Sequence, residues 1–239
     1  QWDDIMANYS IDTQDTLPNG NELFTIIYTS GTTGNPKGVM VDFAAVSECL
    51  FATRNFVFAE RTGTRFFSYL PLCHIAERNI VESLAIVTGG VIYFAENLDT
   101  FSKNLQNANP THFLAVPRIW TKFQLGILSK LPQKKLNILL RIPIVGSLIK
   151  KKIKKGLGLS ETWMCYTGAA PMPVSLIQWF GKLGIDIHEA YGMTENLGAV
   201  CMMPLGKKVE GSVGKVYPGM EVNIDKDTGE ILTRSKWNM

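Results

Sequence analysis

Short apolar runs alternate with longer stretches of helical periodicity along most of this chain, and this alternation constrains the fold more than any other feature. Strands separated by helices favour an α/β fold, with a mostly parallel sheet flanked by helices on both faces. The predicted strands are 24–28, 65–70, 91–94, 112–116, 164–167 and 185–189. The predicted helices are 43–56, 76–88, 99–106, 117–130 and 173–183.

The residue pattern of the sequence changes beyond about Pro204. Glycines and prolines now separate short alternating runs such as 221–224 and 230–232, a pattern typical of antiparallel strands. We therefore expect an α/β subdomain over residues 1–205. The beginning of a β subdomain, the start of a small β-barrel-like element, is expected over residues 206–239.

Composition excludes several classes of protein. Of the 239 residues, 46% are hydrophobic and 19% are charged, which indicates a globular chain rather than a disordered one. The four cysteines are scattered and form no Cys-x-x-Cys pair, which favours reduced core thiols in a cytoplasmic protein over a disulfide frame or a zinc site. They are Cys49, Cys73, Cys165 and Cys201. The three histidines are equally dispersed, which argues against a histidine metal centre.

A loop rich in glycine and hydroxyl side chains follows the first predicted strand. Residues 28–38 have the sequence Tyr-Thr-Ser-Gly-Thr-Thr-Gly-Asn-Pro-Lys-Gly. Glycines let the backbone approach an anion, hydroxyls donate hydrogen bonds, and lysine supplies positive charge, so the loop is a candidate phosphate cradle as well as a plain polar turn. The order differs from a P-loop, because the lysine follows proline. The candidate residues are Thr29, Ser30, Gly31, Thr32, Thr33, Gly34 and Lys37.

Two further motifs follow later predicted strands. Residues 191–195 are Tyr-Gly-Met-Thr-Glu, which combine an aromatic face, a hydroxyl and a carboxylate that suit a purine, a phosphate and a divalent metal. The alternative is that Tyr191 belongs to the core and Glu195 begins a helix. Residues 167–171 are Thr-Gly-Ala-Ala-Pro, which alone could be a tight turn. Ligands bind at the carboxyl ends of parallel strands, so we expect these two loops and loop 28–38 to converge on one edge of the sheet.

A fourth motif, Leu-Pro-Leu-Cys-His-Ile-Ala-Glu-Arg over residues 70–78, contains His74. A lone histidine after a strand is more often structural than functional.

Taken together, these motifs resemble the signatures of the AMP-forming adenylating enzymes, the acyl-CoA synthetase or AMP-binding enzyme superfamily. The resemblance covers nearly the whole chain and is strongest to the long-chain fatty-acid–CoA ligases. It implies ATP, a fatty acid and CoA as substrates and Mg²⁺ as a cofactor. A carboxylate would attack the α-phosphate of ATP to give an acyl-adenylate and pyrophosphate, and the CoA thiol would then displace AMP.

The resemblance also implies roles for individual residues. Lys37 would offset phosphate charge, Thr194 would bond the α-phosphate, and His74 would position the substrate. Glu195, with Thr29, would ligate Mg²⁺. Besides loop 29–37, the residues expected to bind the nucleotide are Gly168, Ala169, Ala170, Glu189, Ala190, Tyr191, Gly192, Met193 and Thr194.

Several parts of the family pattern have no match in this sequence. The ribose-binding aspartate of a Thr-Gly-Asp motif and the lysine of the small C-terminal catalytic domain do not occur before Met239. We therefore expect a fragment of the large N-terminal domain, which alone binds nucleotide weakly at most. Two alternatives stay open: a fatty-acyl-AMP ligase that delivers to a carrier protein, and a non-catalytic nucleotide- or lipid-binding module.

Residues 134–155 contain eight lysines or arginines and no acid. One interpretation is a solvated pair of helices with a lysine-rich face. The other is peripheral contact with anionic lipid headgroups. Nucleic acid is a poorer partner, because no aromatic residues are interleaved with these bases.

Overall fold

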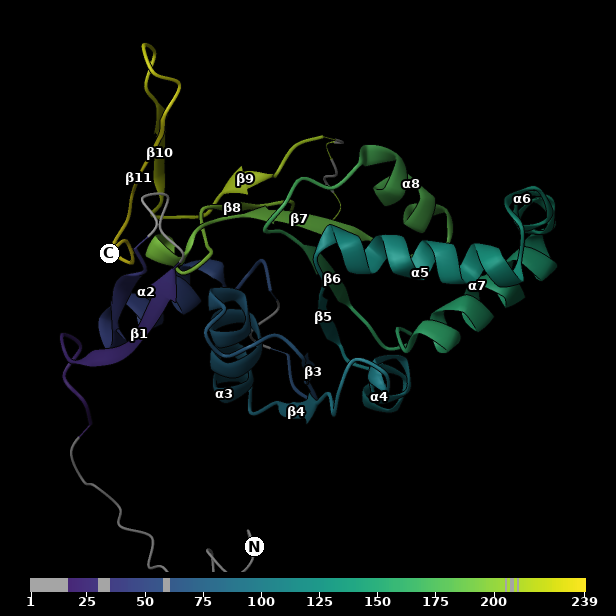
Figure 1. Cartoon of the computed structure of the whole chain (residues 1–239), viewed down its shortest axis with the longest axis horizontal. Helices are drawn as coiled ribbons and strands as arrows, with labels where there is room; N and C mark the ends of the chain where they lie inside the picture. Colours follow the sequence, from purple (N-terminus) through teal and green to yellow (C-terminus); the bar gives the residue numbers. More distant parts are fainter. Residues whose placement is uncertain (1–16, 30–34, 58–60, 205, 207–208, 210) are drawn as a thin grey trace, which may run out of the picture.

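A seven-stranded mixed sheet forms the centre of the computed structural model, which describes residues 17–29, 35–57, 61–204, 206, 209 and 211–239. The strand order is β4-β3-β5-β6-β7-β8-β9 (Figure 1). The first five strands in this order are parallel, and β8 and β9 are antiparallel to their neighbours. The strands are β3 Arg65–Ser68, β4 Val91–Phe94, β5 His112–Leu114, β6 Met164–Thr167, β7 Ile187–Tyr191, β8 Cys201–Met202 and β9 Lys215–Val216. The predicted α/β fold is confirmed.

Helices cover both faces of the sheet, and each face has its own apolar core. Neighbouring residues of one strand point to opposite faces, so Phe66 and Tyr166 belong to one core and Phe67 and Cys165 to the other. The first core is closed by α2 Phe43–Thr53, the π-helix η1 Glu77–Ser83 and α3 Leu84–Thr88. The second is closed by α4 Phe101–Ala108, α5 Pro117–Lys130, α6 Gln133–Arg141, α7 Pro143–Leu157 and α8 Val174–Lys182. Figure 1 shows α2 and α3 on one side of the sheet and α5 and α8 on the other.

The first predicted strand lies outside this sheet. Strand β1 (Leu23–Thr29) pairs antiparallel with β2 (Lys37–Asp42) in a separate hairpin, so its expected place in the parallel sheet was wrong. The physical reason is the alternating run at 37–42, whose Val39 and Val41 are buried on the first core together with Ile27. An antiparallel partner so near in sequence costs little loop entropy.

Other boundaries also differ from the predictions. The predicted helix 76–88 is divided into η1 and α3, and it ends at Gly89, whose left-handed φ of 60° favours glycine. The predicted strand 185–189 begins two residues later and continues to Tyr191. The shift has a local cause, because a turn at Gly184 (φ 72°) directs the Ile185 amide back to the Phe180 carbonyl.

The C-terminal segment forms the expected antiparallel pair. Strands β10 (Glu221–Ile224) and β11 (Ile231–Arg234) make a hairpin that extends away from the sheet in Figure 1. The chain then returns to the body, where the buried Trp237 indole donates a hydrogen bond to the Ala199 carbonyl at 3.1 Å. The Met239 amide donates to the Glu195 carbonyl at 2.9 Å.

The basic segment forms the predicted pair of helices, α6 and α7. They cross so closely that a Cβ at Gly146 would lie 2.9 Å from the Leu140 carbonyl oxygen, which explains glycine there. Of the four free cysteines, Cys49, Cys165 and Cys201 are buried, but Cys73 is exposed. The expectation of a core thiol was wrong for Cys73, because it lies in the exposed run 71–73 after β3. Among the described helices, none combines the length and the apolar character needed to cross a bilayer.

Candidate active site

Two of the predicted loops meet at the carboxyl ends of β6 and β7. Thr167 and Glu189 lie opposite each other in parallel register, so the chain leaves both strands at the same edge of the sheet. A Cβ on Gly168 would lie 3.1 Å from the Ala190 carbonyl oxygen, so a larger residue would push the two loops apart. Ala169 has a left-handed φ of 63°, which turns the loop back over this edge, and Ala170 is exposed. The predicted convergence of these two loops is confirmed.

The Tyr-Gly-Met-Thr-Glu motif is held in a closed loop. The Gly198 amide donates to the Met193 carbonyl at 2.7 Å, and the buried Asn196 side chain accepts from the Met193 amide at 2.7 Å. A Cβ on Gly192 would overlap the carbonyl group of Gly198, so the backbone at the start of the loop touches the backbone at its end. These bonds fix the direction in which Thr194 and Glu195 project.

Both interpretations of this motif describe part of what is found. Tyr191 is the last residue of β7, half-buried, and packs against the first core. Glu195 lies in a short 3₁₀-helix, η2 (Thr194–Asn196), with an exposed side chain, and Thr194 is half-buried beside it. An aromatic face, a hydroxyl and a carboxylate therefore stand together at one edge of the sheet.

The segment with His74 reaches the same loop from β3. Its backbone forms a turn in which the His74 amide donates to the Pro71 carbonyl at 2.8 Å. Nδ1 of His74 accepts the Ala76 amide at 3.2 Å, so the ring proton of the neutral imidazole lies on Nε2. Burial lowers the pKa of His74, which keeps the ring neutral at pH 7. Asn79 then ties the segment to the motif, because its Nδ2 donates to the Leu197 carbonyl at 2.8 Å.

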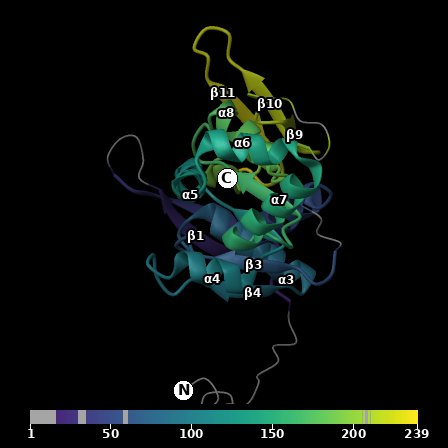
Figure 2. The same cartoon turned by 90° about the vertical axis from the view of Figure 1, so that its right-hand side faces the viewer.

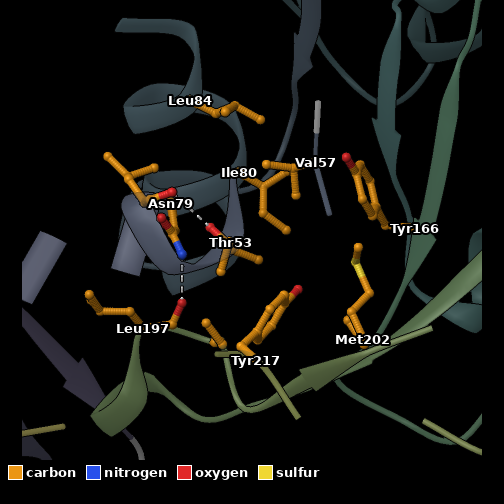
Figure 3. Close-up of a pocket in the computed structure, with 14 residues that line it drawn as sticks. Thr53, Val57, Asn79, Ile80, Leu84, Tyr166, Leu197, Met202 and Tyr217 are labelled. Atoms are coloured by element: carbon orange, nitrogen blue, oxygen red, sulfur yellow. Dashed lines mark hydrogen bonds between the residues drawn. The ribbon is translucent and has the colours of Figure 1, made fainter. Parts of the chain in front are cut away.

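An apolar cavity of about 50 Å³ lies beneath these loops, between the helices of the first core and the sheet (Figure 3). Ile80 and Leu84 line it from the helices, and Ala190 and Met202 line it from the strands. The ring of Tyr166 stands at the sheet side of this cavity. Its buried hydroxyl has no hydrogen-bond partner among the described residues.

Replacing Tyr166 with phenylalanine is expected to raise the free energy of unfolding by about 1 kcal/mol, because the change removes a buried polar atom that forms no bond. Tyr69→Phe is the matched control. The Tyr69 hydroxyl donates to the Leu114 carbonyl at 3.0 Å, so its loss should lower stability by about 1 kcal/mol. Urea titrations measure both. Destabilisation by Tyr166→Phe would show that its hydroxyl is bonded in solution, by water for example.

Only the two ends of the predicted phosphate loop can be placed, because Ser30, Gly31, Thr32, Thr33 and Gly34 lie outside the described residues. Thr29 and Lys37 are opposite each other where the β1–β2 hairpin meets this loop. The Thr29 hydroxyl donates to the Lys37 carbonyl at 3.4 Å, and the Lys37 side chain is exposed. The other end of the hairpin contacts η1, where Arg78 donates to the Thr25 hydroxyl at 3.3 Å.

The expected Mg²⁺ ligands fit the chemistry of that ion. Mg²⁺ keeps several waters and uses one or two carboxylates together with substrate phosphates. The exposed carboxylate of Glu195 and the hydroxyl of Thr29 are oxygen donors of this kind. Within the described part of the chain, no three histidine, cysteine or acidic residues are grouped as a protein-only metal site would require. A metal held here would therefore depend on phosphate for most of its ligands.

The sequence motifs contain or adjoin several important residues that were not singled out. Glu77 is buried, accepts the Leu70 amide at 3.3 Å, and so fixes the turn that carries His74; burial raises its pKa. Asn79 lies one residue beyond that motif, and Tyr166 directly precedes Thr167. The position of Tyr166 inside an apolar predicted strand was a usable signal that its ring is buried. For Tyr217, which lines the cavity from beyond β9, the sequence offers no signal.

The fold and the placement of these loops define an α/β domain whose loops after β6 and β7 meet at the carboxyl ends of a parallel sheet. Two solved structures share the fold: the N-terminal domain of FACL13 from Mycobacterium tuberculosis, at 22% identity and a TM-score of 0.68, and the ATP-bound RpMatB–BxBclM chimera, at 22% identity and 0.70. Each alignment covers 99% of this chain, and 56% and 44% of the respective structure. The sequence model of the AMP-binding enzyme family matches residues 3–239, so this chain belongs to that family.

Two curated relatives are more similar to this chain in sequence than the two solved structures are. The long-chain-fatty-acid–CoA ligase ACSBG2 of Xenopus laevis is 34% identical over 248 residues, which cover 89% of this chain and 33% of that protein. ACSBG2 of Gallus gallus is 32% identical over 273 residues, with 91% and 36% covered. The resemblance to fatty-acid–CoA ligases is thereby confirmed. The chain spans about a third of the length of these two relatives.

Proposed function

We propose that this chain carries the ATP- and acyl-binding part of an AMP-forming long-chain fatty-acid–CoA ligase. The observation that supports this most directly is the position of an apolar cavity beneath the paired loops at the carboxyl ends of β6 and β7. An acyl-adenylate has an apolar chain and a charged nucleotide joined at one phosphorus atom. A site that binds it must place apolar and polar walls side by side, as this edge does.

The proposed first step joins two anions, so the site must offset negative charge and align the reacting atoms. In this scheme the fatty-acid carboxylate attacks the α-phosphorus of ATP, and pyrophosphate leaves. Thr194 would donate its hydroxyl to the α-phosphate, while Lys37 would lie against the departing phosphates. The ring of Tyr191 offers a face to the adenine. Mg²⁺ held by Glu195 would neutralise phosphate charge.

His74 would position the carboxylate rather than remove a proton from it. A fatty acid is already ionised at neutral pH, and the imidazole is neutral with its proton on Nε2. That N–H can donate to a carboxylate oxygen and hold it for in-line attack. The CoA thiol would then attack the acyl carbon, form the thioester and release AMP.

The cavity must enlarge for a long chain to enter. A volume of about 50 Å³ holds one or two water molecules. Ile80 and Leu84 on η1 and α3 form its outer wall, and π-helical turns are rare and occur frequently at functional sites. We therefore propose that this helical layer, rather than the sheet, moves when the acyl chain binds.

The test is ATP–pyrophosphate exchange by the full-length protein with saturated acids from C4 to C18. Long-chain acids should support exchange, and CoA should convert the adenylate to thioester. The 239-residue chain, assayed beside it, should show little exchange. An absence of exchange with every acid would overturn the proposal. Thioester formation on a carrier protein, with none on CoA, would identify a fatty-acyl-AMP ligase instead.

Glu195→Gln in the full-length protein should reduce exchange at least roughly tenfold, because an amide is a much weaker Mg²⁺ ligand than a carboxylate. The defect should shrink as Mg²⁺ is raised. Glu161→Gln changes the same charge at an exposed position before β6 and should leave exchange unchanged. Equal activity of the two variants would remove Glu195 from the proposed metal site.

A further inference from the structure

We propose that one exposed face of α6 and α7 is a docking surface for an anionic lipid bilayer, on which both helices lie flat in the headgroup region. We call this face the α6–α7 stripe. It consists of Lys134, Ile138, Arg141, Ile144, Leu148, Lys151 and Lys155. The inference rests on the packing and charge of these helices and not on the proposed reaction.

The stripe on α7 is defined by helical spacing. Ile144, Leu148, Lys151 and Lys155 are separated by four, three and four residues, so they share one side of the helix. Ile144 is 78% exposed and Leu148 is 62% exposed. The opposite side carries Ile149, Ile153 and Leu157, which pack against the second core. This helix therefore has two apolar faces, and the described residues cover only one of them.

Helix α6 repeats the arrangement over its shorter length. Lys134, Ile138 and Arg141 share its exposed side, while Leu136 on the other side is fully buried. The close crossing at Gly146 locks α6 against α7. In Figure 2, which looks onto this end of the molecule, both helices lie across it and face outward. The two halves of the stripe are therefore held in a fixed relation at this end of the molecule.

The segment that contains these helices is strongly basic. Residues 100–160 contain twelve lysines or arginines and no aspartate or glutamate. Each lysine or arginine close to an anionic membrane surface contributes about 1 kcal/mol of attraction.

The mixture of side chains selects a bilayer over other anionic partners. Isoleucine and leucine side chains would remain in water against a nucleic-acid backbone, and the stripe has no aromatic residue on which bases could stack. At a membrane surface the aliphatic side chains enter the boundary of the acyl region while lysines remain among the headgroups. The 15-residue α7 has the length and polarity of a helix that lies in this plane.

Co-sedimentation with vesicles tests the surface. The protein should bind vesicles of 70% phosphatidylcholine and 30% phosphatidylserine, and it should bind pure phosphatidylcholine vesicles at least roughly tenfold more weakly. Binding should fall in 0.5 M NaCl, because salt screens exposed charge. Equal binding to the two kinds of vesicle, or none to either, would overturn the proposal.

Two double variants, with a third as a control, separate the contributions of charge and of apolar burial to vesicle binding. Lys151→Glu with Lys155→Glu should weaken binding at least roughly tenfold, whereas Lys215→Glu with Lys226→Glu, the same charge change at exposed positions elsewhere, should not. Ile144→Ser with Leu148→Ser keeps every charge and should weaken binding roughly tenfold through lost apolar burial. Circular dichroism checks that each variant is folded. Dependence on the lysines alone, without Ile144 and Leu148, would indicate binding to a polyanion and overturn the bilayer.

Discussion

Replacing Gly192 with alanine is expected to lower the free energy of unfolding by about 3 kcal/mol and the Tm by about 10 °C. The new methyl group would overlap the carbonyl group of Gly198. The loop cannot widen to make room, because the Gly198 amide is bonded to the Met193 carbonyl at 2.7 Å and the buried Asn196 side chain holds the Met193 amide. Urea or thermal denaturation gives the measurement.

The matched control is Gly126→Ala in α5. A Cβ at this exposed helical position would meet no atom within 4 Å, and alanine has the higher helix propensity. The control should be unchanged or more stable by about 0.5–1 kcal/mol. A Gly192→Ala protein with wild-type stability would mean that the loop is not closed in this way. Nucleotide binding should fail in that variant even at temperatures where it remains folded.

The second large effect is a loss of folding stability at low pH, which we attribute to His112. This ring is buried between Phe66 and Tyr166, with its Nε2 donating to the Val57 carbonyl at 2.8 Å. Burial lowers the pKa of His112 to about 4, assisted by the charge of Arg61 and opposed by the bond to Val57. The unfolded chain has a pKa near 6.5, so it takes up the proton first as pH falls. The resulting stability is present above pH 6.5 and is lost between pH 6.5 and 4.

Between pH 7 and 4.5 the protein should therefore lose about 2–3 kcal/mol through this residue. His112→Gln retains an N–H donor for Val57 but cannot be protonated in this range. The variant should lose that much less stability over the same interval, while both proteins should respond alike between pH 7.5 and 9. Identical losses at low pH would show that His112 does not control acid stability.

The parts of the fold that were predictable are those set by local periodicity. Residues 164–167 and 117–130 form a strand and a helix with the expected bounds, because a uniform apolar or helical pattern fills each segment. The meeting of the loops after β6 and β7 also followed, since parallel neighbours end at the same edge. Strand β2 was missed because its first residues, Lys37 and Gly38, belong to the loop motif.

The remainder depends on packing between distant residues. That Asn79 meets Leu197, or that Tyr217 faces Tyr166 across a cavity, is decided by how the helices of the first core sit on the sheet. The π-helix of η1 has no distinguishing pattern in the sequence. Tyr191 was placed just after a strand, but strand pairing with Cys201 of β8 extends β7 through it. This antiparallel pairing fixes the backbone from which the ring of Tyr191 projects.

The hydrogen bond from Asn79 to Leu197 links the apolar cavity to the loop of residues 191–198 (Figure 3). Asn79 lines the cavity, and Leu197 closes the loop that presents Thr194 and Glu195. A molecule that displaces Asn79 on entering the cavity therefore alters the energy of that loop. Thermodynamic reciprocity requires the converse: a ligand that stabilises the loop must change affinity in the cavity by the same factor. One amide group thus couples the affinities of the protein for two ligands that do not touch each other.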